Sequence, residues 1–359
     1  MSKTSALNEQ SKRYVMRKDK IVAELDSKNR LLDVKANAPY HIKNDAFELW
    51  EQSRQTDVNR TNLRYLRRML GLGSRDTIGA LKKIHYASLF DTFWVKEVGS
   101  TLAWEDVKFT ENPLFLHALC RHDITENLEF KSPEHSTLGS FEKGWKIENG
   151  SWYLYKTGKN EEIWSELFSS RLLGHYLGEK IVNYWLDENF IVCESFINQD
   201  KDECLEHYHS IGGEDTEENK IIEKFTQLGL GDLIPDVLQM LYSDALVLNG
   251  DRHEFNFGIV NSPCGIRFAP LFDWNMSMIA YQYPKNYKRH HDVLIKGVKS
   301  LKIKQNFEVS HSVIETIYHE LAETGLSIKA TKNEIVEFIL SAQDLLRTKN
   351  PANIPPNLC

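Results

Sequence analysis

The sequence predicts an α+β protein in which strands mark the N-terminal part and helices the C-terminal part. Apolar residues alternate from Arg13 to Leu25 and again from Ser151 to Lys156, which is the period of a half-buried strand. From Leu233 to Leu248, and again near 314–321 and 335–346, they recur at helical spacing instead. At roughly 150 residues per unit, the 359 residues suffice for two to three units or one large enzyme of two lobes.

In the first third of the chain, Arg13 to Leu25 predicts two short strands and Ala46 to Arg54 a helix. Residues 59–85 contain two helical patterns separated by a glycine-containing turn, which is one form of a helix-turn-helix. A helical pair whose arginines are solvated or ion-paired is the commoner meaning of this spacing. The arginines concerned are Arg60, Arg64, Arg67 and Arg68. Residues 104–133 are irregular and are expected to be a connector.

In the middle and C-terminal parts, the aromatic strand at 151–156 precedes an amphipathic helix at 162–177 and an apolar strand, FIVCESF. The acidic segment 198–219 is expected to be an exposed loop or a solvated helix end. A helix over 233–248 leads to Asn249, and two amphipathic helices are expected near 314–321 and 335–346.

Composition excludes several classes of protein. The net charge of -7, from 44 basic and 51 acidic side chains, argues against a surface built mainly for nucleic acid. The five cysteines are odd in number and form no CxxC pair, so neither a zinc ribbon nor a disulfide framework is indicated, and a reducing cytoplasm is the expected location. The start lacks the apolar core of a secretory signal, and no run of about 18 apolar residues predicts a membrane span.

Three oxygen-bearing side chains follow the helix that leads to Asn249. Asp251 and Asn256 are five positions apart in GDRHEFNFG, and Asp273 follows a short apolar strand in APLFD. Because Mg²⁺ prefers oxygen ligands, Asn256 and Asp273 are suited to hold it, while Asp251 is suited to accept the proton of an incoming hydroxyl. The set predicts phosphoryl transfer from a nucleotide triphosphate.

GDRHEFNFG followed by APLFD resembles the catalytic and metal motifs of the HipA-like Ser/Thr protein kinase family, and the likeness covers roughly residues 13–300. The resemblance implies a bilobed protein-kinase-like fold with an accessory subdomain at 1–130, an N-lobe at 131–200, a helical C-lobe at 201–350 and a disordered tail at 351–359. It implies ATP and Mg²⁺ as cofactors, Asp251 as base, His253 as a supporting catalytic residue, and Asn256 and Asp273 as metal ligands.

The segment STLGSFEKGW resembles the phosphate-proximal loop of the same family, which implies that Ser136, Gly139 and Ser140 lie near the nucleotide. Within the family, a serine of this loop can be autophosphorylated, which ejects the loop and silences the enzyme. Ser136 matches that serine best, and Ser140 is second.

Residues of the next three elements complete the predicted nucleotide site. Lys156 ends an apolar strand and is expected to neutralise phosphates, with Glu166 of the following helix as its partner. Glu161 and Glu162 are alternatives for that partner. The FIVCESF strand is expected to supply the adenine hinge around Glu194 to Phe196.

The resemblance implies a kinase that transfers the γ-phosphoryl group of ATP to a protein hydroxyl, and some family members are toxins of bacterial toxin-antitoxin systems. A translation factor or a tRNA synthetase is then the expected type of substrate, an antitoxin is the expected partner, and DNA is contacted indirectly if at all. GDRHxxN also resembles the catalytic loop of phosphatidylinositol kinases, so a lipid acceptor stays an alternative. A weakly active, DNA-linked nucleotide-binding regulator is a third hypothesis, which the intact acidic set disfavours.

Other motifs have plainer interpretations. Gly139 and Gly144 have Walker-loop spacing, but Trp145 occupies the position that the Walker lysine requires. His207 and His209, two positions apart, are interpreted as surface histidines because no further ligands follow at metal spacing. The basic run 281–304 is interpreted as a solvated rim, with an anionic substrate dock or nucleic-acid surface as the alternative.

Overall fold

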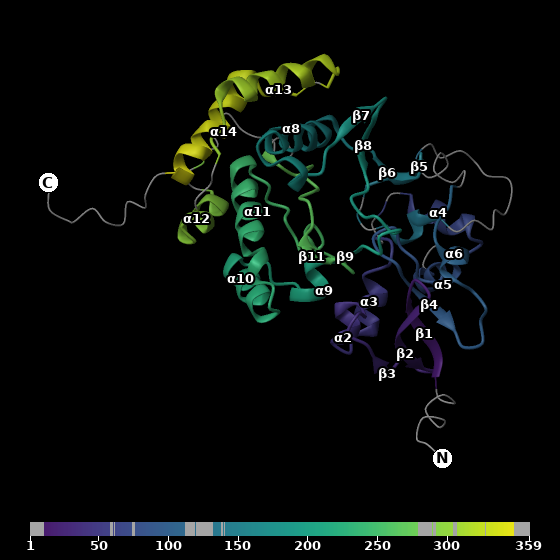
Figure 1. The fold of residues 1–359 in the computed structure, drawn as a ribbon. Helices are drawn as coiled ribbons and strands as arrows, with labels where there is room; N and C mark the ends of the chain where they lie inside the picture. Colours follow the sequence, from purple (N-terminus) through teal and green to yellow (C-terminus); the bar gives the residue numbers. More distant parts are fainter. Residues whose placement is uncertain are drawn as a thin grey trace. The chain divides into compact units, whose positions relative to one another are not determined.

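A computed structural model describes residues 11–57, 60, 62–73, 76–111, 119, 132–137, 139, 141–278, 289, 292–303, 307–326 and 328–347. Internal contacts divide the chain into two compact units (Figure 1). Unit 1 comprises Met1–Gly158, Leu186–Gly213 and Gly258–Ala269, and unit 2 comprises Lys159–Trp185, Glu214–Phe257 and Pro270–Cys359. The three predicted domains and the tail, with boundaries after residues 130, 200 and 350, stay a prediction, and the tail lies outside the described residues.

The first sheet of unit 1 has the strand order β3-β2-β1-β4, and its described pairs are antiparallel. Its strands are β1 (Ser11–Arg17), β2 (Lys20–Asp26), β3 (Leu31–Val34) and β4 (Phe93–Glu97). The two strands expected from alternation are therefore confirmed. Helices α2 (Tyr40–Lys43), α3 (Phe47–Gln52) and α6 (Trp104–Val107) contribute side chains to the same hydrophobic core, in which Trp50, Trp94 and Trp104 are at most 4% exposed.

The helical pair predicted in 59–85 is present as α4 (Leu63–Met69) and α5 (Thr77–Lys83). Arg64 and Arg68 are exposed, as solvated arginines would be, whereas Arg60 and Arg67 are not solvated but 2% and 1% exposed. Both buried guanidinium groups donate to backbone carbonyl oxygens, Arg60 to Glu134 and Arg67 to Asp76. Helical spacing could not reveal this, because it shows which residues share a face and not what covers that face.

The second sheet of unit 1 has the order β5-β6-β8-β7, with β5 (Lys143–Glu148), β6 (Ser151–Lys156), β7 (Trp185–Asp187) and β8 (Phe190–Glu194). The third, of order β11-β10-β9, contains β9 (Cys204–His207), β10 (Gly258–Ser262) and β11 (Gly265–Phe268), and α9 (Tyr208–Gly212) follows β9. The acidic segment 198–219 is thus not simply an exposed loop. It supplies β9, where Glu206 is 5% exposed, and Asp202, whose carboxylate pairs with Arg17 at 3.1 Å.

The described part of unit 2 is mainly helical, as expected. It contains α8 (Asn160–Leu177), α10 (Glu218–Gln227), α11 (Ile234–Val247), α12 (Val293–Ser300), α13 (His311–Glu323) and α14 (Lys332–Arg347), and the short 3-10 turns η2 (Gly178–Lys180) and η3 (Gly231–Leu233). Apolar residues at helical spacing are buried on α13 and α14, including Ile314, Ile317 and Leu321. Arg289, placed in the predicted solvated rim, is instead 3% exposed and donates to the Leu246 carbonyl oxygen at 3.3 Å.

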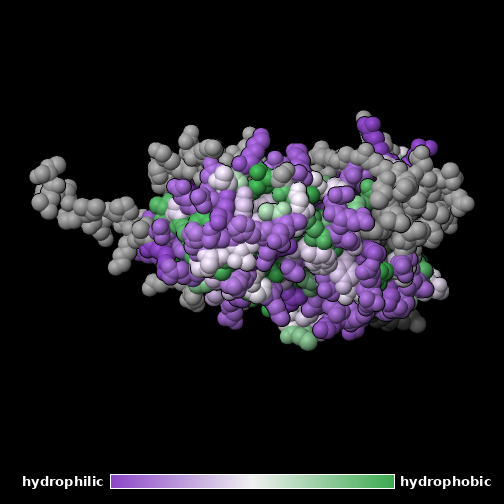
Figure 2. Space-filling view, turned by 90° about the horizontal axis from the view of Figure 1, so that it is seen from above, coloured by the Kyte–Doolittle hydropathy of each residue, from purple (hydrophilic) through white to green (hydrophobic). Residues whose placement is uncertain are grey.

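Hydrophilic residues predominate on the face drawn in Figure 2, with hydrophobic residues scattered among them. Within the described residues, no helix combines the length and the apolar character that a bilayer span requires. His207 and His209 are half-buried rather than on the open surface, and the ring of His209 contacts that of His41 edge-on, with centroids 5.1 Å apart. No group of three or more His, Cys, Asp or Glu side chains arranged to hold a metal is found in the described segments.

Candidate active site

The end of α11 positions the candidate catalytic segment in unit 2. Leu248 adopts a left-handed conformation, with φ of 54°, and the Asn249 N–H donates to the Asp244 carbonyl oxygen at 2.8 Å. A left-handed residue after the last turn ends a helix and satisfies its free carbonyl groups. The chain therefore leaves α11 directly into the loop 249–257, which carries two of the three predicted oxygen ligands.

Within this loop, Asp251 and Asn256 are joined by a hydrogen bond. The Asn256 side-chain amide donates to the Asp251 carbonyl oxygen at 3.0 Å, and the Asn256 side chain is buried. Backbone bonds from His253 N–H to Asp251 O and from Asn256 N–H to His253 O, both 2.9 Å, tighten the loop between them. Because its Nδ2 donates, the Oδ1 of Asn256 is the atom suited to a metal.

Asp273 reaches the same unit from another part of the chain. A parallel bridge joins Ile181 to Leu271, with the Val182 N–H donating to the Leu271 carbonyl oxygen at 2.9 Å. The Asp273 N–H then donates to the Tyr184 hydroxyl oxygen at 3.3 Å. Asp273 itself has a φ of 64°, a left-handed conformation that is rare for residues with a side chain and that often marks functional sites.

Arg252 ties these segments together. Its Nη1 donates to the carbonyl oxygen of Asn256 at 2.8 Å and to that of Phe272, the residue before Asp273, at 2.5 Å. Its Nε and Nη2 donate to the Asp244 carboxylate on α11, at 3.0 and 2.9 Å. The side chains of this ion pair are 6% and 3% exposed. We call this set, Asp244 with Arg252 and the two carbonyl groups, the Arg252 network.

The sequence alone does not reveal the partners of Arg252 in this network. Asp244 was not singled out, because an acidic residue inside an otherwise apolar helix carries no spacing signal. Asn249 joins the network through its side-chain amide, which donates to Asp244 Oδ1 at 2.9 Å. A guanidinium that presents several donors in a fixed plane is suited to hold two carbonyls and a carboxylate at once.

Asp251 has a raised pKa. Burial of the half-exposed carboxyl is the main cause, and the charge of Asp273 raises the pKa further, whereas His253 and Arg252 lower it. The charge of Asp273 thus acts on the carboxyl of Asp251, as expected for neighbouring carboxylates. A cation between two such carboxylates would relieve their repulsion.

His253, predicted as a supporting catalytic residue, lies in the loop with an exposed side chain. Its Nδ1 accepts a hydrogen bond from the Phe255 N–H at 3.2 Å, so the proton of the neutral ring belongs on Nε2. His253 also acts on the site through its charge, which lowers the pKa of Asp251. A direct catalytic role stays a prediction.

Lys156 and Glu166 are both buried, in different units. Lys156 is the last residue of β6, is 6% exposed and pairs with Ile191 of β8 in the sheet register. Glu166 lies in the first half of α8 and is 1% exposed. Buried ionisable groups of this kind require compensating partners, but the ion pair between these two residues stays a prediction.

The predicted phosphate-proximal loop is described in part. Ser136 ends the 3-10 turn η1 (Pro133–Ser136), is 3% exposed and donates to the Pro133 carbonyl oxygen at 3.3 Å. Gly139 has a φ of 98°, a conformation that glycine adopts at little cost, and Ser140 lies outside the described residues. Thr56 Oγ1 also donates to the His135 carbonyl oxygen at 2.7 Å, so η1 is held against the N-terminal part of unit 1.

Glu194 and Phe196, the predicted hinge, lie at the end of β8 and just beyond it. Glu194 is exposed and pairs with Tyr153 across the sheet, while Phe196 is half-buried. Both line a cavity of about 560 Å³ in unit 1, together with Trp152 and Asn149. Binding of adenine by these residues stays a prediction.

Comparisons with known proteins support the fold but not the details of the site. No protein-family profile and no curated protein matches the chain. Among solved structures, HipA from Shewanella oneidensis MR-1, in a complex with HipB and operator DNA, is similar at 14% identity over 93% of this chain and 95% of that chain, with a TM-score of 0.51. The proinflammatory kinase CtkA of Helicobacter pylori is similar at 16% identity over 58% of this chain and 90% of that chain, with a TM-score of 0.40.

The first of these likenesses spans nearly the whole of both chains. It confirms the predicted α+β, protein-kinase-like fold class. At this identity the likeness establishes the fold alone, so the chemistry has to be argued from the residues of the site.

Proposed function

We propose that this protein is an ATP- and Mg²⁺-dependent phosphotransferase that acts on a serine or threonine hydroxyl of another protein. The observation that supports this best is the Arg252 network, which brings the loop of Asp251 and Asn256 next to the segment of Asp273 within one unit. The kinase-like fold gives this arrangement a precedent. A phosphoryl-transfer site needs little more from the protein than positioned oxygen ligands, a base and cations for the phosphates.

The residues present fit a magnesium site. Magnesium in nucleotide-dependent enzymes is usually held by one or two protein carboxylates, together with substrate phosphates and water. Asp273 and the Oδ1 of Asn256 would hold it here, and when bound it would neutralise charge on the transferred group. Asp251, whose raised pKa makes it a better proton acceptor than an ordinary carboxylate, would take the proton of the acceptor hydroxyl. Lys156 is our candidate for binding the nucleotide phosphates.

A labelling experiment tests this proposal. Purified protein is incubated with magnesium, γ-labelled ATP and either a protein extract or inositol-lipid vesicles. We expect labelled protein, and we expect Asp251→Asn and Asp273→Asn to reduce labelling by at least about 100-fold, since a general base alone contributes about 10² to 10⁴. Asp232→Asn, at an exposed acidic position in η3 of the same unit, is the matched control and should keep full activity.

The outcomes separate the alternatives. Label in lipid only would replace the protein kinase by a lipid kinase. Undiminished labelling by Asp251→Asn and Asp273→Asn would remove the assigned site. Nucleotide binding without any transfer, together with salt-dependent DNA binding, would favour the regulator hypothesis.

We further propose that the protein acts with a protein partner, as a toxin with its antitoxin. The similar HipA was solved together with HipB and operator DNA. The likeness covers 93% of this chain, so we propose that this chain, too, has a surface that binds such a partner. Copurification of an untagged protein encoded beside this one, from a host that expresses both, tests the idea. Recovery of this chain alone in that experiment counts against it.

A further inference from the structure

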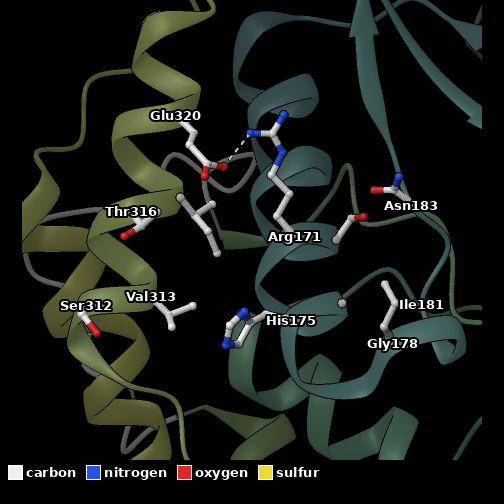
Figure 3. Close-up of a pocket in the computed structure, with 12 residues that line it drawn as sticks. Arg171, His175, Gly178, Ile181, Asn183, Ser312, Val313, Thr316 and Glu320 are labelled. Carbon is white, nitrogen blue, oxygen red and sulfur yellow. Dashed lines mark hydrogen bonds and ion pairs between the residues drawn. The ribbon is translucent and has the colours of Figure 1, made fainter.

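A cavity of about 530 Å³ lies within unit 2, and no residue of the loop 249–257 lines it. It is bounded by α8, by α13 and by the segment that follows α8, and Figure 3 shows the residues that line it. Its volume lies in the range of small-molecule sites, roughly 300 to 1,000 Å³. None of the residues assigned to phosphoryl transfer belongs to its lining.

Gly174 indicates that this space is kept open. It lies in the last turns of α8, where glycine destabilises a helix relative to alanine. Its φ is not in the left-handed range, and a Cβ added to it would meet no atom within 4 Å. Neither backbone conformation nor close packing therefore explains a glycine here. Gly178, by contrast, has a φ of 57° at the C-cap of α8, which does explain it.

The lining has an apolar side and a charged end. Ile181 and Ile317 are 5% and 6% exposed, and Val313 of α13 is half-buried. At the charged end, Arg171 Nη1 contacts Glu320 Oε2 at 3.2 Å, and the two side chains are 26% and 52% exposed. An ion pair as exposed as this one contributes little stability, so its guanidinium is available to a competing anion.

His175 lies one helical turn beyond Arg171 and, in Figure 3, points from α8 towards Val313 of α13. Arg171 and His175 lie on one face of α8. In Figure 3, however, the Arg171 side chain runs along α8 towards Glu320 and away from His175, so Arg171 is the basic group of the charged end. The acidic Glu320 is the more exposed member of its pair and can turn into water when an anion takes its place.

We propose that the α8–α13 cavity binds a small organic carboxylate, with its carboxylate on Arg171 and its apolar body against Val313, Ile317 and Ile181. An apolar wall with a few convergent polar groups is the usual composition of such sites. A planar guanidinium is the side chain best suited to bind a carboxylate. The test of this proposal needs neither nucleotide nor turnover, so its outcome can be told apart from that of the proposed kinase reaction.

Binding of 3-phenylpropanoate and of the neutral 3-phenylpropanamide, measured by calorimetry on the full chain, tests the proposal. We expect the carboxylate to bind about tenfold more tightly than the amide, and Arg171→Gln to abolish that difference. Lys180→Gln is the matched control, because Lys180 also forms an exposed ion pair, with Asp236 at 2.7 Å, but lies outside the lining. This control should bind both compounds like the unmodified protein.

Two variants of Gly174 test the cavity itself. Gly174→Leu should fill the space and weaken binding of both compounds at least about tenfold. Gly174→Ala should raise the Tm by about 2 °C through helix propensity, while weakening binding. Equal binding of carboxylate and amide would overturn the proposal, as would absence of binding at about 10 mM, or Gly174 variants that bind normally.

Discussion

At the scale of single residues, Asp251 links burial to reactivity. Its raised pKa comes first from desolvation and then from the neighbouring charge of Asp273, against the opposing charges of His253 and Arg252. Asp251 must be deprotonated to accept a proton, so the rate of phosphoryl transfer should fall as the pH drops through this raised pKa.

Replacement of His253 provides a prediction about that dependence. His253→Gln removes a group that lowers the pKa of Asp251, so the acidic limb of the rate–pH profile should move to higher pH. Because the His253 side chain is exposed, this substitution should leave folding unchanged, and the melting temperature checks this. Steady-state labelling rates between pH 5 and pH 8 provide the measurement, and a limb that stays in place would contradict the electrostatic role.

Arg252 provides a second prediction. Arg252→Lys keeps the charge but cannot hold the Asp244 carboxylate and two carbonyl groups together, so kcat should fall at least about tenfold with a smaller change in the KM for ATP. Arg347→Lys, at an exposed ion pair with Glu308 in the same unit, is the control and should leave both constants unchanged. A change in KM alone would mean that the network serves binding and not placement of the reacting groups.

At the scale of elements, β9 places the carboxyl group of Glu206 in the protein interior, where ionisable groups are rare. Glu206 is 5% exposed, its Oε2 accepts from the Tyr40 N–H at 3.1 Å, and burial raises its pKa to about 7. Since the folded state binds this proton more tightly than the unfolded chain, Glu206 lowers the free energy of unfolding as the pH rises from about 4.5 to about 7.

We therefore predict that Glu206→Gln is more stable than the unmodified protein at pH 8, and that the advantage shrinks towards pH 4.5. The full difference is on the order of 3 kcal/mol, from the size of the shift in pKa. Urea unfolding at several pH values measures it. Comparing the two proteins at each pH cancels His41, whose pKa of about 4 gives an opposite slope because burial keeps that ring neutral. A difference in stability that does not depend on pH would refute the assignment.

Elements differ in how well the sequence predicts them. β6 and α11 were predicted almost to the residue, because alternation and helical spacing are strong in SWYLYK and in IPDVLQMLYSDALV. β9 was missed because its four residues lie in an acidic stretch, where local composition indicates a loop. Its strand character comes from pairing with β10, in which Gly258 lies 51 residues after its partner His207, and a local pattern does not contain such a contact.

The same distinction applies to the site. Asp251, Asn256 and Asp273 were found because their residue types and order match a known chemistry. Asp244 and Tyr184, which position the loop of Asp251 and the segment of Asp273, were not found, because one polar residue in an apolar segment has no characteristic spacing. Their roles follow from tertiary contacts, an ion pair to Arg252 and a hydrogen bond to the Asp273 N–H.

At the scale of the whole molecule, ligand binding should be visible as stability. A ligand present at about 100 times its Kd stabilises the native state by about 2.7 kcal/mol, so magnesium with a non-hydrolysable ATP analogue should raise the Tm by several degrees. We predict that a chelator abolishes this rise and that Asp273→Asn weakens it, as thermal scanning would measure. An equal rise for the nucleotide without magnesium would mean that the metal is not part of the bound state.

The left-handed backbone at Asp273 also limits which residues can replace Asp273 during evolution. Asparagine and glycine tolerate that conformation as well as aspartate does, whereas glutamate and alanine do not, although all four are one base change away from aspartate. Natural descendants that abandon catalysis should therefore carry Asn or Gly at this position far more often than Glu or Ala. Silenced copies of this gene would then encode proteins that still fold, and they could persist as competitors for whatever the active protein binds.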